Sequence, residues 1–134
     1  SRIGVAIDYG TTDKKVLSHA QALAQQQHAE LCLFHVVEGV SGQLYGKEAY
    51  DDEARADREQ LETIAAQLRV TGISVVSYLG FGSVPDEIVR LTKENNIDLL
   101  IMGGHGHRGL KDVFFGASIS KVRHRLSIPV LVVQ

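Results

Sequence analysis

Residues 98–132 read DLLIMGGHGHRGLKDVFFGASISKVRHRLSIPVLV, and this stretch decides how the chain folds. Its first part, residues 99–102, is an apolar run without a polar break, which is typical of a strand buried on both faces of a parallel sheet. Five glycines follow, at positions 103, 104, 106, 109 and 116. The apolar residues Ile119, Val122 and Leu126 then recur at helical spacing, so we expect a helix to begin after Gly116.

A strand, a glycine-rich loop and a helix start, in this order, favour an anion-binding site. Glycines let the backbone turn tightly and bring its N–H groups close to a ligand. The first turn of a helix adds N–H groups without intrahelical partners and the positive end of the helix dipole. The same glycines could instead form a tight turn with no ligand, and their spacing alone leaves both interpretations open.

Strand and helix patterns alternate along the whole chain. The expected strands cover residues 2–8, 30–37, 73–81, 99–102 and 129–133. Between them we expect helices, with residues 51–69 as the longest, residues 38–50 as a long loop, and a capping box with proline at residues 83–86. Such alternation predicts an α/β protein whose parallel sheet has helices on both faces. Ligands are expected at the carboxyl ends of the strands, where the strand order reverses.

Length and composition indicate one globular domain over residues 1–134. A net charge of −2 is too small to favour nucleic acid or a membrane surface as a partner. The single cysteine, Cys32, stands in an apolar run and predicts a buried thiol rather than a disulfide, which suits the cytoplasm. No run of 18 apolar residues occurs, so we expect no insertion into a membrane. The chain starts with Ser1 rather than methionine and could be part of a longer protein.

Two common nucleotide motifs fit the glycines only in part. Gly104, Gly106 and Gly109 have the spacing of the dinucleotide fingerprint, but that fingerprint needs an acid about 20 residues further on, where the chain reads PVLVV. Gly104 and Gly109 also have the spacing of a P-loop. However, residues 110–112 read LKD where the P-loop needs lysine followed by serine or threonine. We therefore expect neither motif to operate here.

A third pattern is Gly103-x-x-Gly106, nine residues, and then Gly116 followed by a small residue. Together with the strand that ends at Asp8, the HVV ending of the second strand and the closing PVLVV, it resembles the universal stress protein family over essentially the whole chain. The resemblance implies a flavodoxin-like (Rossmann-like) three-layer sandwich with a five-stranded parallel sheet in the order 3-2-1-4-5. In one branch of the family it also implies a site for ATP or AMP, with Mg²⁺ as a companion of ATP.

The resemblance places the nucleoside at the ends of the first two strands. Ile7 and Asp8 would lie beside the adenosine, with Asp8 near the ribose or the adenine. The backbone of Val36 would read the adenine edge. An acid that ends a first strand could equally cap the following helix, so both roles remain open for Asp8. His35 is expected to be a hydrogen-bonded structural residue.

The resemblance assigns the sugar and phosphates to the glycine-rich stretch. Met102 and Gly103 would line the sugar and the α-phosphate. Gly106, Gly116 and the helix start after Gly116 would hold the phosphates through backbone N–H groups.

One residue departs from the family's nucleotide-binding pattern, which has serine or threonine directly after the last glycine. That position is Ala117 here, so a hydroxyl ligand is lost while the backbone N–H remains. Ser118 and Ser120 follow and could donate from the same helix turn. His105 and Arg108 could face the phosphates or be solvated. No further metal ligands are placed beside His105, so a metal site is not expected.

The last strand is an edge strand in the order that the resemblance implies. An edge strand has unpaired backbone groups that require a cover, and pairing with a second copy of the chain supplies one. The residues of this expected homodimer contact are Val130, Leu131, Val132 and Val133.

Three classes of function follow from these features. The first is an adenine-nucleotide-binding stress-response or regulatory domain, in which the ligand orders the loop from Gly104 to Gly116 and biases a dimer surface. The second is an interaction or dimerisation module without a nucleotide, and Ala117 favours it. One version of this module is the cytosolic regulatory domain of a membrane transporter. The third is an enzyme, but without a P-loop lysine we expect at most slow ATP hydrolysis.

Overall fold

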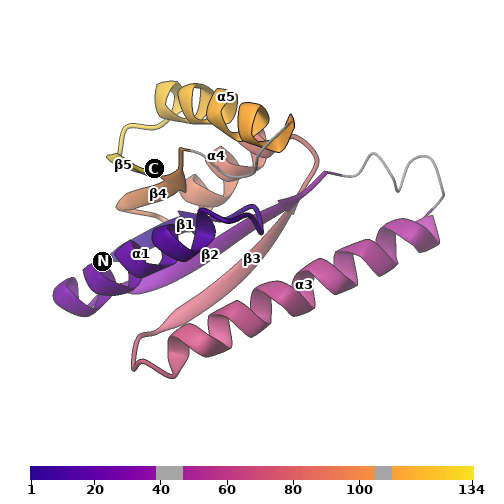
Figure 1. The fold of residues 1–134 in the computed structure, drawn as a ribbon. Coiled ribbons are helices and arrows are strands. Elements are labelled where there is room, and N and C mark those ends of the chain that lie inside the picture. The colour runs from indigo at the N-terminus through magenta and orange to yellow at the C-terminus, as the bar shows by residue number, and fades with distance from the viewer. Residues whose placement is uncertain (39–46, 105–109) are drawn as a thin grey trace.

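Strands and helices alternate from one end of the chain to the other in this computed structural model. It describes residues 1–38, 47–104 and 110–134, and for residues 47–51 and 110–117 it describes the backbone but not the side chains. The elements are β1 (Arg2–Ala6), α1 (Asp13–Gln27), β2 (Glu30–Val37), α3 (Lys47–Arg69), β3 (Val75–Phe81), α4 (Val84–Glu94), β4 (Leu99–Gly103), α5 (Leu110–Arg125) and β5 (Val130–Val133) (Figure 1). The predicted alternation is confirmed.

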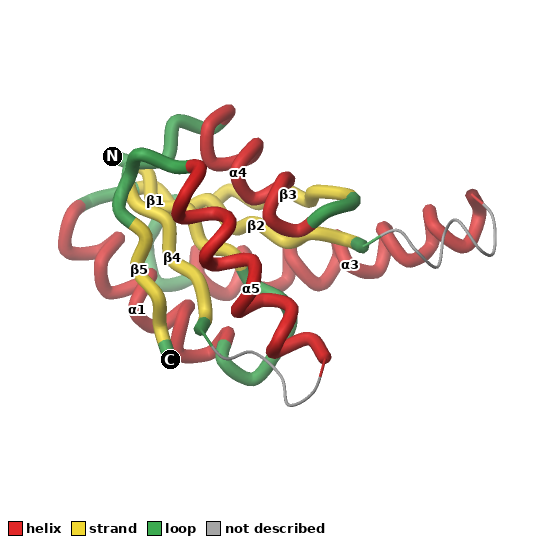
Figure 2. Tube along the Cα trace, turned by 90° about the horizontal axis from the view of Figure 1, so that it is seen from above, coloured by secondary structure: helices red, strands yellow, loops and turns green. Residues whose placement is uncertain are grey.

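The five strands form one parallel sheet in the order β3-β2-β1-β4-β5. Helices α1 and α3 cover one face of it, and α4 and α5 cover the other (Figures 1 and 2). The order reverses at β1, because β2 lies on one side of β1 and β4 lies on the other. This is the flavodoxin-like three-layer sandwich with strand order 3-2-1-4-5 that the sequence predicted.

The core lies on both faces of the central strands. In β2, Leu31 and Leu33 pack in the cluster under α1 and α3, whereas Cys32 and Phe34 pack in the cluster under α4 and α5. All four side chains are fully buried. The alternation of side chains along a strand explains why a strand with two covered faces has a continuous apolar sequence. Cys32 is a buried free thiol, as predicted.

The start of α3 differs from the prediction. Because α3 begins at Lys47, the loop predicted over residues 38–50 is wrong for residues 47–50, while residues 39–46 lie outside the described residues. The first residues of α3, KEAYDD, have no apolar stripe that would have indicated a helix. Their acids nevertheless suit the positive end of the helix dipole.

The start of α5 also differs. This helix begins at Leu110, so the prediction of a helix start after Gly116 is wrong, and Gly116 lies inside α5. Residues 110–115 contain no proline, and one glycine inside a helix costs only about 1 kcal/mol relative to alanine. The start of α4 predicted at residues 83–86 is confirmed, with Ser83 as the N-cap and a proline in the first turn, but Ser83 makes no side-chain capping hydrogen bond, so the capping box itself is wrong.

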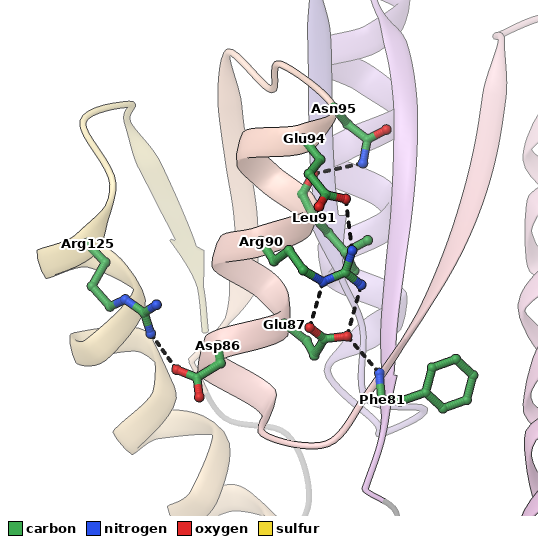
Figure 3. A network of polar contacts seen from close by, with 8 residues as sticks. All are labelled: Phe81, Asp86, Glu87, Arg90, Leu91, Glu94, Asn95 and Arg125. Carbon is green, nitrogen blue, oxygen red and sulfur yellow. Dashed lines mark hydrogen bonds and ion pairs between the residues drawn. The ribbon is translucent and has the colours of Figure 1, made fainter.

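The two edges of the sheet differ in whether side chains form hydrogen bonds with their outward-facing backbone groups. On β3, Val75 and Phe81 direct their N–H and C=O groups away from β2, because Ser74 and Gly82 bond toward it. Arg69 donates two hydrogen bonds to the Val75 C=O, at 3.0 and 2.8 Å. At the other end of β3, Glu87 accepts the Phe81 N–H at 2.9 Å (Figure 3).

The Glu87 carboxylate is itself held in place on α4. Arg90 donates to both of its oxygens and also to Glu94 one turn further along (Figure 3). Side chains thus cover the open edge of β3 at both ends, which hinders pairing with another strand.

The edge formed by β5 has no comparable cover among the described residues. Pro129 and Val133 accept hydrogen bonds from β4 and its continuation, so the alternate residues Val130 and Val132 direct their N–H and C=O groups outward. Leu131 is 37% exposed on this edge.

None of the described helices is long and apolar enough to cross a membrane.

Helix α1 approaches the sheet closely at the end of β4. A Cβ atom on Gly103 would lie 3.2 Å from Thr12 Cγ2 and 3.4 Å from Val16 Cγ2. Packing against α1 is therefore sufficient reason for a glycine at this position, with or without a ligand.

We predict that Gly103→Ala lowers the free energy of unfolding by about 1–2 kcal/mol, because the added methyl group overpacks this contact. Thr12→Ser removes the Cγ2 methyl and keeps the hydroxyl, so the cost of Gly103→Ala should be smaller in that background. Urea unfolding of the four proteins of this double-mutant cycle measures the difference. An equal cost in both backgrounds would show that the Thr12 contact does not require the glycine.

Candidate functional site

Three strand ends lie level with one another where the strand order reverses. Ala6 of β1 is paired with Phe34 of β2 and with Met102 of β4. The residues that follow on each strand, among them Asp8, Val36 and Gly103, therefore stand at the same edge of the sheet. The structure thus brings together the residues that the sequence assigned to the nucleoside and the sugar.

Ile7 and Asp8 follow β1, which ends at Ala6 rather than at Asp8 as predicted. The Ile7 N–H still donates to the Phe34 C=O at 2.9 Å, and Ile7 is 2% exposed. Val36 is half-buried on β2, opposite Gly80 of β3. The side chain of Met102 is fully buried in the cluster under α4 and α5, so only its backbone is placed toward the strand end.

Two carboxyl groups meet at the turn between β1 and α1. The Asp8 N–H donates to Asp13 Oδ1 at 3.3 Å, and Asp8 Oδ1 accepts the Gly10 N–H at 2.9 Å. Asp8 Oδ2 is buried and accepts no hydrogen bond from an N–H or hydroxyl group of the described residues. Burial, and then the charge of Asp8, raise the pKa of Asp13 to about 7.

This geometry decides the helix-cap alternative for Asp8. The N-cap of α1 is Thr12, and Asp8 bonds the backbone two residues ahead of it in the chain, in the manner of an Asx-turn. Asp8 is therefore not the cap of α1, and the interpretation as a cap is wrong.

Tyr9 links three elements beside this carboxyl pair. Its ring stacks on the His35 ring with centroids 3.8 Å apart, and its hydroxyl donates to the Asp57 C=O of α3 at 2.5 Å. His35 Nδ1 lies 2.9 Å from the Ile7 C=O oxygen, which confirms His35 as a hydrogen-bonded structural residue. Its Nε2 lies 3.8 Å from Asp57 Oδ2. Burial and the negative charges of Asp57 and Asp13 raise the pKa of Tyr9.

The backbone of Tyr9 has a φ of +61°, in the left-handed region. The other described non-glycine residues with positive φ, His28 and Asn96, stand at helix ends, where this conformation is common. A tyrosine in this conformation costs of order 1–3 kcal/mol and is typical of functional sites. Sequence reasoning missed Tyr9, and the available signal was an aromatic residue between a strand-ending acid and a glycine.

The remaining predicted residues are described only in part. Ser118 is 3% exposed inside α5, and Ser120 is exposed. Gly116 and Ala117 lie in α5, where the backbone alone is described. His105, Gly106 and Arg108 lie outside the described residues. Within the described part of the chain, no three His, Cys, Asp or Glu side chains gather closely enough to hold a metal ion.

Fold and site together define a class of protein. It is a flavodoxin-like α/β protein whose polar side chains gather at the carboxyl ends of the strands, at the point of reversal where this class binds ligands. The sequence profile of the universal stress protein family matches residues 1–134. The chain belongs to the universal stress protein family.

Individual relatives agree with this membership. Universal stress protein YxiE of Bacillus subtilis is 30% identical, over 97% of this chain and 96% of that protein. Universal stress protein MJ0577 of Methanocaldococcus jannaschii is 26% identical, over 95% of this chain and 90% of that protein. The solved structure of MJ0577 superposes with a TM-score of 0.85, covering 98% of this chain and 94% of that one.

Two further solved structures share the fold and contain adenine nucleotides. A universal stress protein from Archaeoglobus fulgidus in complex with dAMP has a TM-score of 0.75 and 20% identity, covering 99% of this chain and 97% of that one. A universal stress protein in complex with cAMP has a TM-score of 0.70 and 18% identity, covering 100% of this chain and 96% of that one.

We predict that two substitutions at Tyr9 destabilise the protein to different extents. Tyr9→Ala loses the stack on His35 and keeps a side chain at positive φ, so the free energy of unfolding should fall by about 2 kcal/mol. Tyr9→Gly loses the same contacts but relieves the backbone, so it should be about 1 kcal/mol more stable than Tyr9→Ala. Urea unfolding measures both. A glycine variant no more stable than the alanine variant would mean that the turn is not strained.

Proposed function

We propose that this protein is a stress-response or regulatory protein that binds an adenine nucleotide at the carboxyl edge of β1 and β4. The observation that carries the proposal is the buried Asp8 Oδ2, which lacks an N–H or hydroxyl donor at the point where the strand order reverses. A carboxylate oxygen in that position is an acceptor for a ribose hydroxyl or an adenine amine. The dAMP and cAMP complexes of relatives with this fold support the same ligand class.

In this proposal the nucleoside lies against Ile7, Asp8 and the backbone of Val36. The sugar and α-phosphate lie near the backbone of Met102 and Gly103, and these positions share one edge of the sheet. Support for the base position comes from the half-buried Val36, which lies two residues beyond Phe34, the last residue of β2 that pairs with β1.

The phosphates are assigned to Gly106, Gly116 and the N–H of Ala117, with Ser118 as a further donor and His105, Arg108 and Ser120 as outer contacts. Since α5 begins at Leu110, its first turn is the source of free N–H groups, and Gly116 is not. ATP or AMP would both fit such donors, and Mg²⁺ would accompany ATP.

Regulation is proposed to act through a homodimer of the 134-residue domain in the cytoplasm, joined by β5 at residues Val130, Leu131, Val132 and Val133. The contrast between the two edges supports this choice. Arg69 and Glu87 cover the edge of β3, whereas Val130 and Val132 direct their backbone groups outward on β5. The ligand would order the glycine-rich loop and thereby bias this surface.

A second candidate is an interaction module that binds no nucleotide. One version of it is a regulatory domain tethered to a membrane transporter. Ala117 favours it, because the hydroxyl that the family pattern places after the last glycine is replaced by a methyl group. Catalysis is not proposed beyond slow ATP hydrolysis.

We predict that AMP, cAMP or Mg-ATP raises the melting temperature of the protein. At about 100 times its dissociation constant, a ligand stabilises the fold by roughly 2.7 kcal/mol, which a thermal shift detects readily. Asp8→Asn places an amide donor where the ligand needs an acceptor and should abolish most of the shift. Gly106→Val should reduce the shift for Mg-ATP more than for adenosine.

Glu94→Gln, which changes an exposed carboxylate on α4, is the matched control and should keep the full shift. The protein must first be shown by mass spectrometry to carry no copurified nucleotide. Protein free of nucleotide that shows no shift with any of these ligands would contradict nucleotide binding and favour the interaction module.

For the homodimer, we predict that Leu131→Lys converts a dimer into a monomer, because it places a charge in the apolar contact between two β5 strands. Leu131 is already 37% exposed, so the fold itself should be stable with the substitution. Val70→Lys is the control, since Val70 is 87% exposed far from β5 along the chain. Sedimentation velocity measures the mass. A Leu131→Lys protein that remains dimeric would contradict this interface.

A further inference from the structure

The carboxyl groups of Asp8 and Asp13 lie in the same turn, where the Asp8 N–H donates to Asp13 Oδ1 and Asp8 Oδ2 is buried. We propose that they share one proton, and that this proton couples ligand binding at the edge of β1 to pH. The coupling rests on the proposed function, whereas the shared proton does not. The pair would make the site a pH-dependent receptor whose affinity falls as the pH rises.

The geometry of the turn argues for a shared proton. Asp13 Oδ1 accepts the Asp8 N–H, and Asp8 Oδ1 accepts the Gly10 N–H, so one oxygen of each carboxyl group is already held by the backbone. The negative charge of Asp8 acts on Asp13, so the two carboxyl groups interact. Asp8 Oδ2 is buried and has no N–H or hydroxyl donor among the described residues. A proton held by Asp13 would supply the donor that this oxygen lacks.

Burial and the negative charge of Asp8 are the largest causes that raise the pKa of Asp13, while hydrogen bonds from the Asp8 and Tyr9 backbone lower it. From α3, Asp57 adds a further negative charge near Tyr9, and His35 of β2 lies 3.8 Å from Asp57. On α1 itself, Lys14 and Lys15 are exposed. Burial and the Asp8 charge raise the pKa of Asp13 to about 7, so the proton is exchanged in the neutral range.

The charge of the pair decides how a nucleotide is received. With the shared proton the pair carries one negative charge, and Asp8 Oδ2 keeps a lone pair for a ribose hydroxyl or an amine of the ligand. When the proton leaves, two adjacent negative charges repel each other and the phosphates of the ligand. Affinity should therefore fall as the pH rises through about 7, by up to about tenfold per pH unit for one linked proton.

The shared proton can be tested on unfolding without any ligand. The pKa of Asp13 is raised on folding, so folding favours its protonated form. The free energy of unfolding of the wild type should therefore fall as the pH rises from about 4 to about 7 and then level off. The side chain introduced by Asp13→Asn is neutral at every pH, so this variant should lack the fall. The melting temperature of Asp13→Asn minus that of the wild type should therefore increase by several degrees between pH 5 and pH 8.

Asp86→Asn is the matched control, because Asp86 also lies in the first turn of a helix but its pKa is lowered by Arg125. The melting temperature of Asp86→Asn minus that of the wild type should be constant above pH 5. Carbon-13 NMR of the aspartate carboxyl groups in the wild-type protein gives the same test without a substitution. The shared proton is overturned if the Asp13→Asn difference is flat with pH, or if the carboxyl signals of both residues titrate below pH 5.

The coupling is tested by the dissociation constant of AMP between pH 6 and pH 8.5. The ratio of the wild-type constant to that of Asp13→Asn should rise by about fivefold or more over this range, and the titration of AMP itself cancels in the ratio. A flat ratio would overturn the coupling. Binding of AMP by no variant at any pH would contradict the proposed function and the coupling together, while the unfolding series would still decide the shared proton.

Discussion

Strand β1 is hydrogen-bonded along both of its edges, and the rest of the architecture depends on this double pairing. Residues Arg2–Ala6 pair with β2 on one side, and residues 3–6 pair with β4 on the other. The fit is close at its centre, where a Cβ atom on Gly4 would lie 3.0 Å from Phe34 and 3.1 Å from Ile97. The segment that follows β1 and the segment that follows β4 run to opposite faces of the sheet. They therefore diverge at the carboxyl ends of these two strands, and a ligand can fit between them.

The residues at this edge are under physical constraints that do not serve stability. Two carboxyl groups lie in one turn, where burial and the charge of Asp8 raise the pKa of Asp13, and a tyrosine adopts positive φ beside them. Both features oppose folding, by charge repulsion and by backbone strain. The surrounding contacts hold them in place: Tyr9 stacks on His35, and His35 bonds the backbone of Ile7. Such a concentration of unfavourable local terms is typical of a binding site.

The two edges of the sheet illustrate how side chains decide which strand can pair with another chain. On β3 the guanidinium of Arg69 and the carboxylate of Glu87 bond the outward backbone groups, and Arg90 holds Glu87 in position. On β5 the strand is short and apolar, and Leu131 is partly exposed. Covering one edge and leaving the other available would restrict the proposed homodimer to pairing through β5.

The sequence by itself determined the alternation of strands and helices, the parallel sheet and the edge at which a ligand would bind, because these follow from apolar periodicity and from short-range connections. It also predicted Asp8 and Gly103 as site residues, and that prediction remains to be tested by binding. It could not separate a phosphate-binding role for Gly103 from its packing against Thr12, since that contact joins residues distant in the chain. Likewise, it misplaced the starts of α3 and α5, where no apolar stripe or helix breaker marks the boundary.

Only the tertiary structure decided the chemistry of the turn after β1. Asp13 reads as an ordinary acid in the first turn of a helix, and Tyr9 as a loop aromatic. Folding half-buries Asp13 near Asp8, which raises the pKa of Asp13, and places Tyr9 between His35 and α3. The pKa of Asp13 and the positive φ of Tyr9 depend on burial and on neighbours in space. The local sequence does not contain this information.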